Sequence, residues 1–160
     1  MAIQVRDPVP NVTLMKAGSD GPEPVDTESF FSGRKVAVFS VPGAFTPTCS
    51  ARHLPGFVEK ADELRAKGVD EVACVSVNDA FVMGAWGQQA GAEGKVTMLA
   101  DGNGEFARAI GLTMDGTKFG MGTRGQRWSA IVDDGVVREL NVEEPGAFSV
   151  SSAEYILNQL

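Results

Sequence analysis

Short runs of apolar and β-branched residues along the chain predict the strands of a central sheet. The run 36–41 (VAVFSV) is apolar at nearly every position, which is typical of a strand buried on both faces of a parallel sheet. The stretches 69–77 and 96–100 predict the next two strands. Two further runs, 127–132 and 136–142, flank the turn residues Asp-Asp-Gly, and this arrangement predicts a β-hairpin.

Helical periodicity separates these strands. Phe57, Ala61 and Leu64 lie at positions i, i+4 and i+7, which places them on one helix face, and Gly68 supplies the stop. Proline removes a backbone donor and clashes with the preceding turn, so Pro55-Gly56 predicts an interruption before that face. Further helices are predicted over 80–90, where Asn78-Asp79 supplies the cap, and over 105–110 and 152–160.

The order of these elements indicates the fold class. Strand and helix alternate as β-α-β-α-β, a hairpin and a last helix follow, and this is the order of the thioredoxin fold. Two extended pieces joined by a polar turn at 17–24 precede it, and 111–125 is expected to be a glycine-rich loop. Repeats and linkers are absent from the sequence, so we expect one α/β domain over 1–160, a mixed sheet flanked by helices.

Composition and charge exclude several function classes. The 160 residues are 43% apolar and 22% charged, as in ordinary globular proteins, and the net charge is −7 with scattered basic residues, which argues against a nucleic-acid partner. Apolar runs fall far short of the roughly 20 residues that span a bilayer. Residues 1–15 lack the apolar segment of a signal peptide, so we expect a cytoplasmic protein. Two cysteines and one histidine cannot build a structural zinc site or a disulfide framework.

Candidate chemistry concentrates directly after the strand 36–41. Thr46 is a suitable helix N-cap, Pro47 suits the first helical position, and Cys49 follows at the third. A thiol there faces unsatisfied backbone N–H groups, and such a position lowers a cysteine pKa from its ordinary value of about 8.5. The position alone is equally compatible with a capped helix that carries a structural cysteine.

The surrounding string favours a reactive cysteine. Pro42-x-x-x-Thr46-x-x-Cys49 matches the peroxidatic motif of the peroxiredoxins, and 41–57 (VPGAFTPTCSARHLPGF) resembles the type II, or peroxiredoxin-five, subfamily. The resemblance implies a thioredoxin fold with N-terminal additions, no cofactor, and thiol-dependent reduction of hydroperoxides. It continues through four more stretches, 72–86, 93–101, 127–137 and 140–146.

The resemblance also implies roles for individual residues. The Cys49 thiolate attacks the peroxide and becomes a sulfenic acid, while Pro42 shields it from solvent. The Thr46 hydroxyl and an arginine donate hydrogen bonds to the reacting atoms. The subfamily pattern Arg-x-x-Arg-aromatic matches 124–128, and we expect its first arginine, Arg124, to face the sulfur, with Arg127 as the second candidate.

Three other functions compete with a peroxidase. His53 follows Cys49 by four residues, which raises a Cys–His hydrolase or acyltransferase. An intrahelical i, i+4 pair points both side chains the same way, however, so a structural role for His53 is favoured. A thioredoxin-type dithiol enzyme needs Cys-x-x-Cys, but Thr46 occupies the first cysteine position. In a non-enzymatic thioredoxin-like binding module, Cys49 would be incidental.

The second cysteine bears on how the enzyme is regenerated. Cys74 lies within the apolar strand 69–77, where we expect it to be buried, and the tail 145–160 has no cysteine. Bridging Cys49 to Cys74 would require unravelling of the helix start or the strand. We therefore expect a one-cysteine route with an external thiol, either glutathione with glutaredoxin or thioredoxin. The resemblance also implies a homodimer, with Phe45 and 78–86 at the interface.

Overall fold

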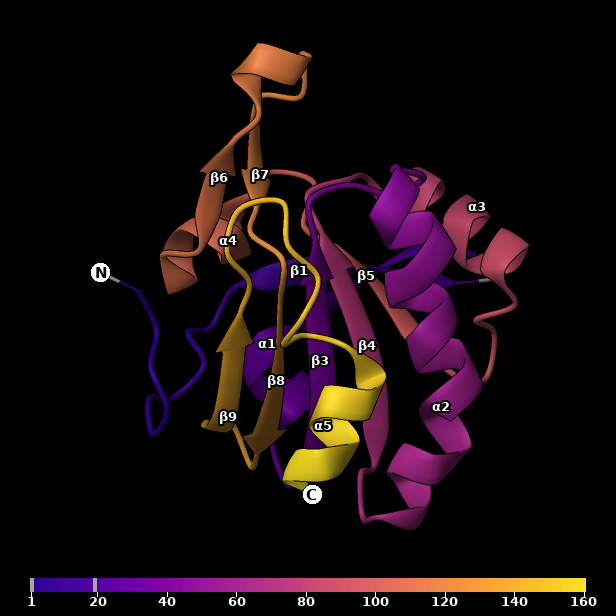
Figure 1. Cartoon of the computed structure of the whole chain (residues 1–160), viewed down its shortest axis with the longest axis vertical. Coiled ribbons are helices and arrows are strands. Elements are labelled where there is room, and N and C mark those ends of the chain that lie inside the picture. Colours follow the sequence, from indigo (N-terminus) through magenta and orange to yellow (C-terminus); the bar gives the residue numbers. More distant parts are fainter. Residues whose placement is uncertain (1, 19) are drawn as a thin grey trace.

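The computed structural model describes residues 2–18 and 20–160, and of Cys49 it describes the backbone alone. A seven-stranded mixed sheet of order β2-β1-β5-β4-β3-β8-β9 forms its centre (Figure 1). The strands are β1 Thr13–Gly18, β2 Gly21–Asp26, β3 Lys35–Val41, β4 Glu71–Ser76, β5 Thr97–Ala100, β8 Trp128–Asp133 and β9 Val136–Val142.

The parallel core of the sheet is the one that the apolar runs predict. β4 pairs in parallel with β3 on one side and with β5 on the other, and β1 and β8 add antiparallel strands outside them. The alternate residues Ala37, Phe39 and Val41 of β3 are buried, and so are Val36 and Val38, which point to the opposite face of the sheet. Burial on both faces explains why this strand reads as a continuous apolar run.

Helices cover both faces of the sheet. α2 Leu54–Ala66, α3 Ala80–Ala90 and α5 Ala153–Gln159 contribute to one apolar core, whereas α1 Thr27–Phe31 and α4 Glu105–Ile110 border the other face. The helices predicted at 80–90, 105–110 and 152–160 are confirmed, and Asp79 caps α3 by accepting from the Val82 N–H at 2.9 Å. α1 was not predicted. Within the described residues, a helix long and apolar enough to span a membrane is not found.

The start of α2 differs from the prediction. An interruption was expected at Pro55-Gly56, but α2 runs through both residues, and the irregular turn is the π-helical segment Cys49–His53 before them. Pro55 directly follows the π-helical segment, and a π turn is a usual place for the irregular hydrogen bonding that a residue without a backbone N–H imposes on a continuing helix. The apolar face is confirmed, because Phe57, Ala61 and Leu64 are all fully buried.

The segment 111–125 is not the simple loop that its glycines suggest. β6 Thr113–Asp115 and β7 Thr123–Gly125 pair antiparallel, with a 3₁₀ turn at Thr117–Phe119 between them, and this hairpin projects at the top of Figure 1. Its strands have only three residues each, which is too short for an alternating pattern to appear. The hairpin matters because Arg124 is the middle residue of β7.

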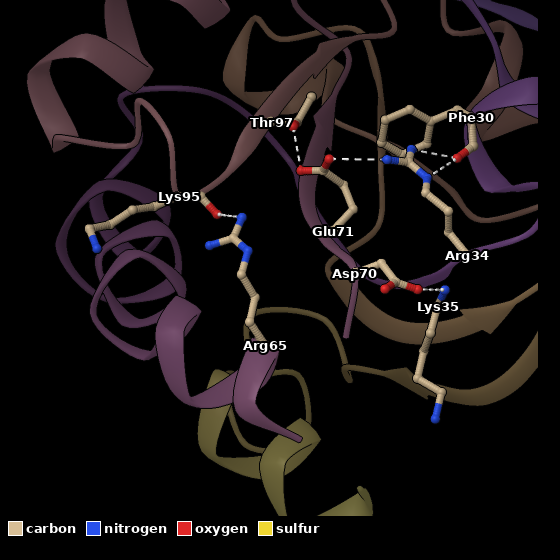
Figure 2. A network of polar contacts seen from close by, with 8 residues as sticks. All are labelled: Phe30, Arg34, Lys35, Arg65, Asp70, Glu71, Lys95 and Thr97. Carbon is tan, nitrogen blue, oxygen red and sulfur yellow. Dashed lines mark hydrogen bonds and ion pairs between the residues drawn. The ribbon is translucent and has the colours of Figure 1, made fainter. Parts of the chain in front are cut away.

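A polar network fastens the amino ends of the three parallel strands (Figure 2). Glu71, which opens β4, accepts from Arg34 Nη1 at 3.2 Å and from Thr97 Oγ1 of β5 at 2.7 Å. The Asp70 carboxylate accepts from the Lys35 N–H at the start of β3 at 2.9 Å. With this edge held by side chains, the opposite edge of the sheet, where the parallel strands end, carries the loop that contains Cys49.

Candidate active site

The candidate site lies in the loop that follows β3. Hydrogen bonds fix this loop to the end of β4: Ser76 Oγ donates to the Val41 carbonyl at 3.1 Å, and the Ala44 N–H donates to Asn78 Oδ1 at 3.0 Å. Phe45, next in the loop, has a φ of 64°, a left-handed conformation that is rare for a non-glycine residue. Such backbone strain is typical of functional loops held by their surroundings.

Thr46 begins the helix, as predicted. Its carbonyl accepts the first helical hydrogen bond, from the Ser50 N–H at 2.9 Å. Its hydroxyl donates to the Gly43 carbonyl at 2.7 Å, whereas the sequence suggested donation to the sulfur or to a bound molecule. With its proton engaged in this way, the Thr46 oxygen keeps lone pairs with which it can accept a hydrogen bond.

The backbone places Cys49 in the first turns of the helix. Pro47 and Thr48 are helical, and Cys49 opens the π-helical segment Cys49–His53. The predicted position near the helix start is therefore confirmed for the backbone. The side chain of Cys49 lies outside the described residues, so the predicted contacts of its sulfur stay predictions.

Arg124 reaches this loop from the projecting hairpin. Its Nε donates to the Met121 carbonyl at 2.8 Å and its Nη1 to the Val77 carbonyl at 3.1 Å. A Cβ atom placed on Gly43 would lie only 3.3 Å from Arg124 Nη1 and 3.1 Å from Thr46 Cγ2. The close approach explains the glycine. Gly43, which follows the half-buried Pro42, brings Thr46 and Arg124 together, and sequence reasoning missed this role.

His53, in the same helical segment as Cys49, forms a second polar group with Arg127, which directly precedes β8. His53 is fully buried, its Nε2 is 2.8 Å from the Ser151 carbonyl, and its Nδ1 is 2.8 Å from Arg127 Nη1. Arginine can only donate, so Nδ1 must be the acceptor and Nε2 carries the proton. Burial, followed by the positive charge of Arg127, lowers the pKa of His53 to about 3.

This arrangement disfavours the Cys–His hydrolase hypothesis. A general base at neutral pH needs a ring nitrogen that can take a proton and a pKa near the working pH. Nδ1 of His53 accepts a hydrogen bond from the Arg127 guanidinium, and Nε2 is already protonated. The lowered pKa of His53 keeps the ring neutral at the working pH. The favoured structural role of His53 fits these contacts.

Cys74 has the position that its strand predicts. It is fully buried in the middle of β4, where it pairs with Phe39 of β3 and Met98 of β5. A backbone bound on both sides cannot move toward another cysteine without the loss of several sheet hydrogen bonds.

Acidic side chains near the strand ends serve the fold. The Asp101 carboxylate accepts from the Phe106 and Ala107 N–H groups at 3.0 and 2.9 Å, which caps α4, and burial raises its pKa. Within the described residues, three or more His, Cys, Asp or Glu side chains do not come together in a way that could hold a metal ion.

Aromatic residues border the site on the side of α3. Trp86 is buried and its Nε1 donates to Ser50 Oγ at 3.0 Å, which joins α3 to the helix of Cys49. Phe45 is 48% exposed and Phe81, near the start of α3, is 74% exposed. Both lie in the region expected at a dimer interface.

Comparisons with known proteins agree with the motif. The Redoxin family model matches residues 4–157. The chain is 52% identical to the chloroplastic peroxiredoxin-2E-2 of Oryza sativa subsp. japonica, over 99% of this chain and 72% of the rice protein. It is 47% identical to peroxiredoxin-2B of Arabidopsis thaliana, over 99% and 98% of the two chains.

A solved structure extends the agreement to the fold. Reduced Prx3 from Vibrio vulnificus, crystallised in complex with H₂O₂, superposes with a TM-score of 0.94 at 52% identity and covers 98% of each chain. The thioredoxin fold predicted from the order of elements is thereby confirmed. On the matched family, the sequence identity and the shared fold, this chain belongs to the peroxiredoxins, in the type II or peroxiredoxin-five-like subfamily.

Proposed function

We propose that this peroxiredoxin reduces hydroperoxides at Cys49 by a one-cysteine route in which an external thiol restores the enzyme. A thiol-dependent peroxidase activity follows from membership of the family. The observation that carries the assignment to Cys49 is the motif Pro42-x-x-x-Thr46-x-x-Cys49, folded as a strained loop that leads into the first turns of a helix.

The chemical step follows from these groups. The Cys49 thiolate attacks the distal peroxide oxygen, so an S–O bond forms as the O–O bond breaks. The sulfur is oxidised to sulfenic acid, and the leaving oxygen takes a proton and departs as water or an alcohol. Negative charge moves from sulfur to the leaving oxygen, so fixed donors around both oxygens lower the barrier. The Thr46 oxygen, whose own proton goes to Gly43, would accept from the peroxide O–H.

Two arginines could supply the donor, and their contacts suggest different tasks. Arg124 donates to the carbonyls of Met121 and Val77, and so joins the hairpin to the end of β4 beneath Gly43. Arg127 donates to His53. Positions 49 and 53 share one face of the helix, because residues four apart lie nearly one turn from each other.

We therefore assign the donor at the sulfur to Arg127, and we assign to Arg124 the shaping of the loop around Gly43. The sequence favoured Arg124 for the first task. Single alanine variants of the two arginines distinguish the assignments, because only the donor aimed at the developing charge should strongly affect the rate of peroxide reduction.

The burial of Cys74 supports the one-cysteine route. A disulfide needs Cα atoms within about 7 Å and side chains that face each other. The backbone of Cys74 is paired on both sides within the sheet, and its side chain is fully buried. The sulfenic acid at Cys49 would then be reduced by an external thiol, with glutathione and glutaredoxin favoured over thioredoxin.

Exposed aromatic residues support a homodimer. Phe45 and Phe81 present large apolar side chains to solvent, and the Phe45 ring lies 6.3 Å from the ring of the buried Trp86. Burying such residues against a second copy of the chain would remove them from water and would order the loop that leads to Cys49.

A turnover assay tests the function. The enzyme is supplied with hydrogen peroxide or an alkyl hydroperoxide and, in separate reactions, with glutathione plus glutaredoxin or with thioredoxin and its reductase. We expect peroxide consumption with one of these systems, and none in the Cys49→Ser variant. Hydrolysis of a thioester or amide substrate without peroxide consumption would contradict the proposal and favour the hydrolase.

A further inference from the structure

A buried glutamate anchors the segment that leads into α5. Glu143 follows β9 and is 7% exposed. Its Oε2 accepts from the consecutive N–H groups of Ser149, Val150 and Ser151 at 2.7, 2.8 and 2.8 Å, and from Ser151 Oγ at 2.7 Å. Burial alone would raise its pKa, but these hydrogen bonds hold the pKa of Glu143 below its ordinary value. The carboxylate therefore fixes the backbone of 149–151.

The anchored segment in turn fixes the histidine ring. The Ser151 carbonyl accepts from His53 Nε2 at 2.8 Å, so the proton is held on that nitrogen. The ring also packs between Phe39 and Phe148, with centroids 4.7 and 4.9 Å away. Both its tautomer and its orientation are thus determined, which leaves the Nδ1 lone pair pointing in one direction.

The Nδ1 lone pair accepts a hydrogen bond from Arg127. Nη1 donates to His53 Nδ1 at 2.8 Å, and the guanidinium carbon lies 5.9 Å from the centre of the Phe148 ring. The Arg52 guanidinium carbon lies 4.7 Å from the same ring. A neutral acceptor suits this place, since a carboxylate there would neutralise the charge of Arg127, whereas a protonated imidazole would repel it.

We propose that His53 is a positioning residue for peroxide reduction: with its ring fixed by the Ser151 carbonyl and that segment fixed by Glu143, it orients the Arg127 guanidinium toward the reacting sulfur and oxygen atoms. The inference rests on the proposed function and on the assignment of Arg127 as the donor. His53 neither touches the peroxide nor exchanges a proton with it. Its role lies in the acceptor at Nδ1 and in the neutrality of the ring.

The ordinary alternative is that His53 only fills the core. Its full burial and its aromatic neighbours would suffice for that. The two roles differ in one respect: a core residue affects folding and every reaction of Cys49 alike, whereas a positioning residue affects only the reaction that uses Arg127.

The experiment compares two reactions of Cys49 in the full-length protein. One is the second-order reaction with hydrogen peroxide, followed by stopped flow. The other is alkylation by iodoacetamide, which needs the thiolate but no donor at an oxygen. Both are measured above the thiol titration of each protein, so that the thiolate fraction is equal. His53→Leu removes both ring hydrogen bonds, and His53→Asn keeps an acceptor near the position of Nδ1.

We expect His53→Leu to slow the peroxide reaction by about tenfold to a hundredfold, as displaced catalytic groups do, and to leave alkylation nearly unchanged. His53→Asn should recover part of the loss. In the Arg127→Ala background, His53→Leu should add no further loss, because residues that act through one another are not additive.

Several results would overturn the inference. His53→Leu could react with peroxide at the wild-type rate, could lose both reactions equally, or could lose as much with Arg127 already removed. If His53→Leu does not fold, the neighbouring glutamates give a matched pair: Glu143→Ala should slow the peroxide reaction selectively, and exposed Glu144→Ala should not. Equal behaviour of these two variants would also refute the inference. If the wild-type protein does not react with hydrogen peroxide, that result would instead refute the proposed function.

Discussion

The buried neutral imidazole of His53 predicts a specific dependence of stability on pH. The pKa of His53 is about 3 in the folded protein, against about 6.5 in an unfolded chain. The unfolded state therefore binds a proton at higher pH than the folded state does. The stabilisation from this group is fully present above pH 6.5 and is lost as the pH falls from 6.5 toward 3.

The size of the effect follows from the two pKa values. At pH 5 the unfolded histidine is almost fully protonated and the folded one is not, which lowers the free energy of unfolding by about 2 kcal/mol relative to pH 7.5. Glu143, whose pKa is lowered from 4.5, loses its contribution only at more acidic pH. Burial raises the pKa of Asp101, so the contribution of this group to the free energy of unfolding increases as the pH falls. Comparison with a variant that lacks only the histidine cancels both carboxyl contributions.

Urea unfolding at pH 7.5 and pH 5, at one fixed protein concentration, provides the assay. His53→Asn is the comparison, because asparagine does not titrate and keeps an acceptor toward Arg127. The wild type should lose about 2 kcal/mol more than His53→Asn between the two pH values. Equal losses in both proteins would refute a neutral buried imidazole, and with it the tautomer inferred from the contacts of Arg127 and Ser151.

Three more predictions address the donor, the core and the thiol. Arg127→Ala should slow peroxide reduction by about a hundredfold and Arg124→Ala by less, measured by stopped flow; the reverse order would return the donor to Arg124. Phe57 is buried and stacks on Phe39 at 4.0 Å, so Phe57→Ala should lower the free energy of unfolding by about 3–5 kcal/mol, whereas Phe119→Ala at the exposed hairpin tip should change it by less than about 0.5 kcal/mol. Thiolate absorbance against pH, with Cys49→Ser as the blank, should give a midpoint well below about 8.5, and a midpoint at or above that value would contradict activation by the helix start.

Most of the fold could be predicted from local patterns. The parallel strands are continuous apolar runs, and α2 displays its buried face at regular spacing. Caps and turns are equally local: Asp79 accepts from the first turn of α3, and Asp134 and Gly135 adopt φ of 49° and 78° between β8 and β9. The short strands β6 and β7 were missed because three residues carry no periodicity.

The site was predictable in its motif but not in its contacts. The motif residues Pro42, Thr46 and Cys49 lie within one short segment, so their spacing can be recognised in the sequence. The contacts of the arginines depend on residues far apart in sequence: Arg124 binds the Val77 carbonyl, and Arg127 binds His53. Two arginines three residues apart in a short segment have no local signal that distinguishes their partners.

The anchoring of His53 was hidden for the same reason. It depends on Ser151, which is 98 residues further along the chain, and on the Glu143 carboxylate, which accepts from three consecutive backbone N–H groups. Gly43 is different, because a glycine directly after the motif proline was visible. Only the positions of Thr46, Met121 and Arg124 around it show how tightly a side chain at this position would be packed.

The most direct test of the account is the intact mass of the protein after reaction with one equivalent of hydrogen peroxide, without reductant and with a trap for sulfenic acid. We predict one trap adduct per chain, located at Cys49, with Cys74 still open to alkylation after unfolding. The Cys49→Ser variant should give no adduct. A product lighter by two hydrogens, with Cys49 and Cys74 joined in one chain, would contradict the one-cysteine route. An unchanged mass would contradict peroxide reduction at Cys49 itself.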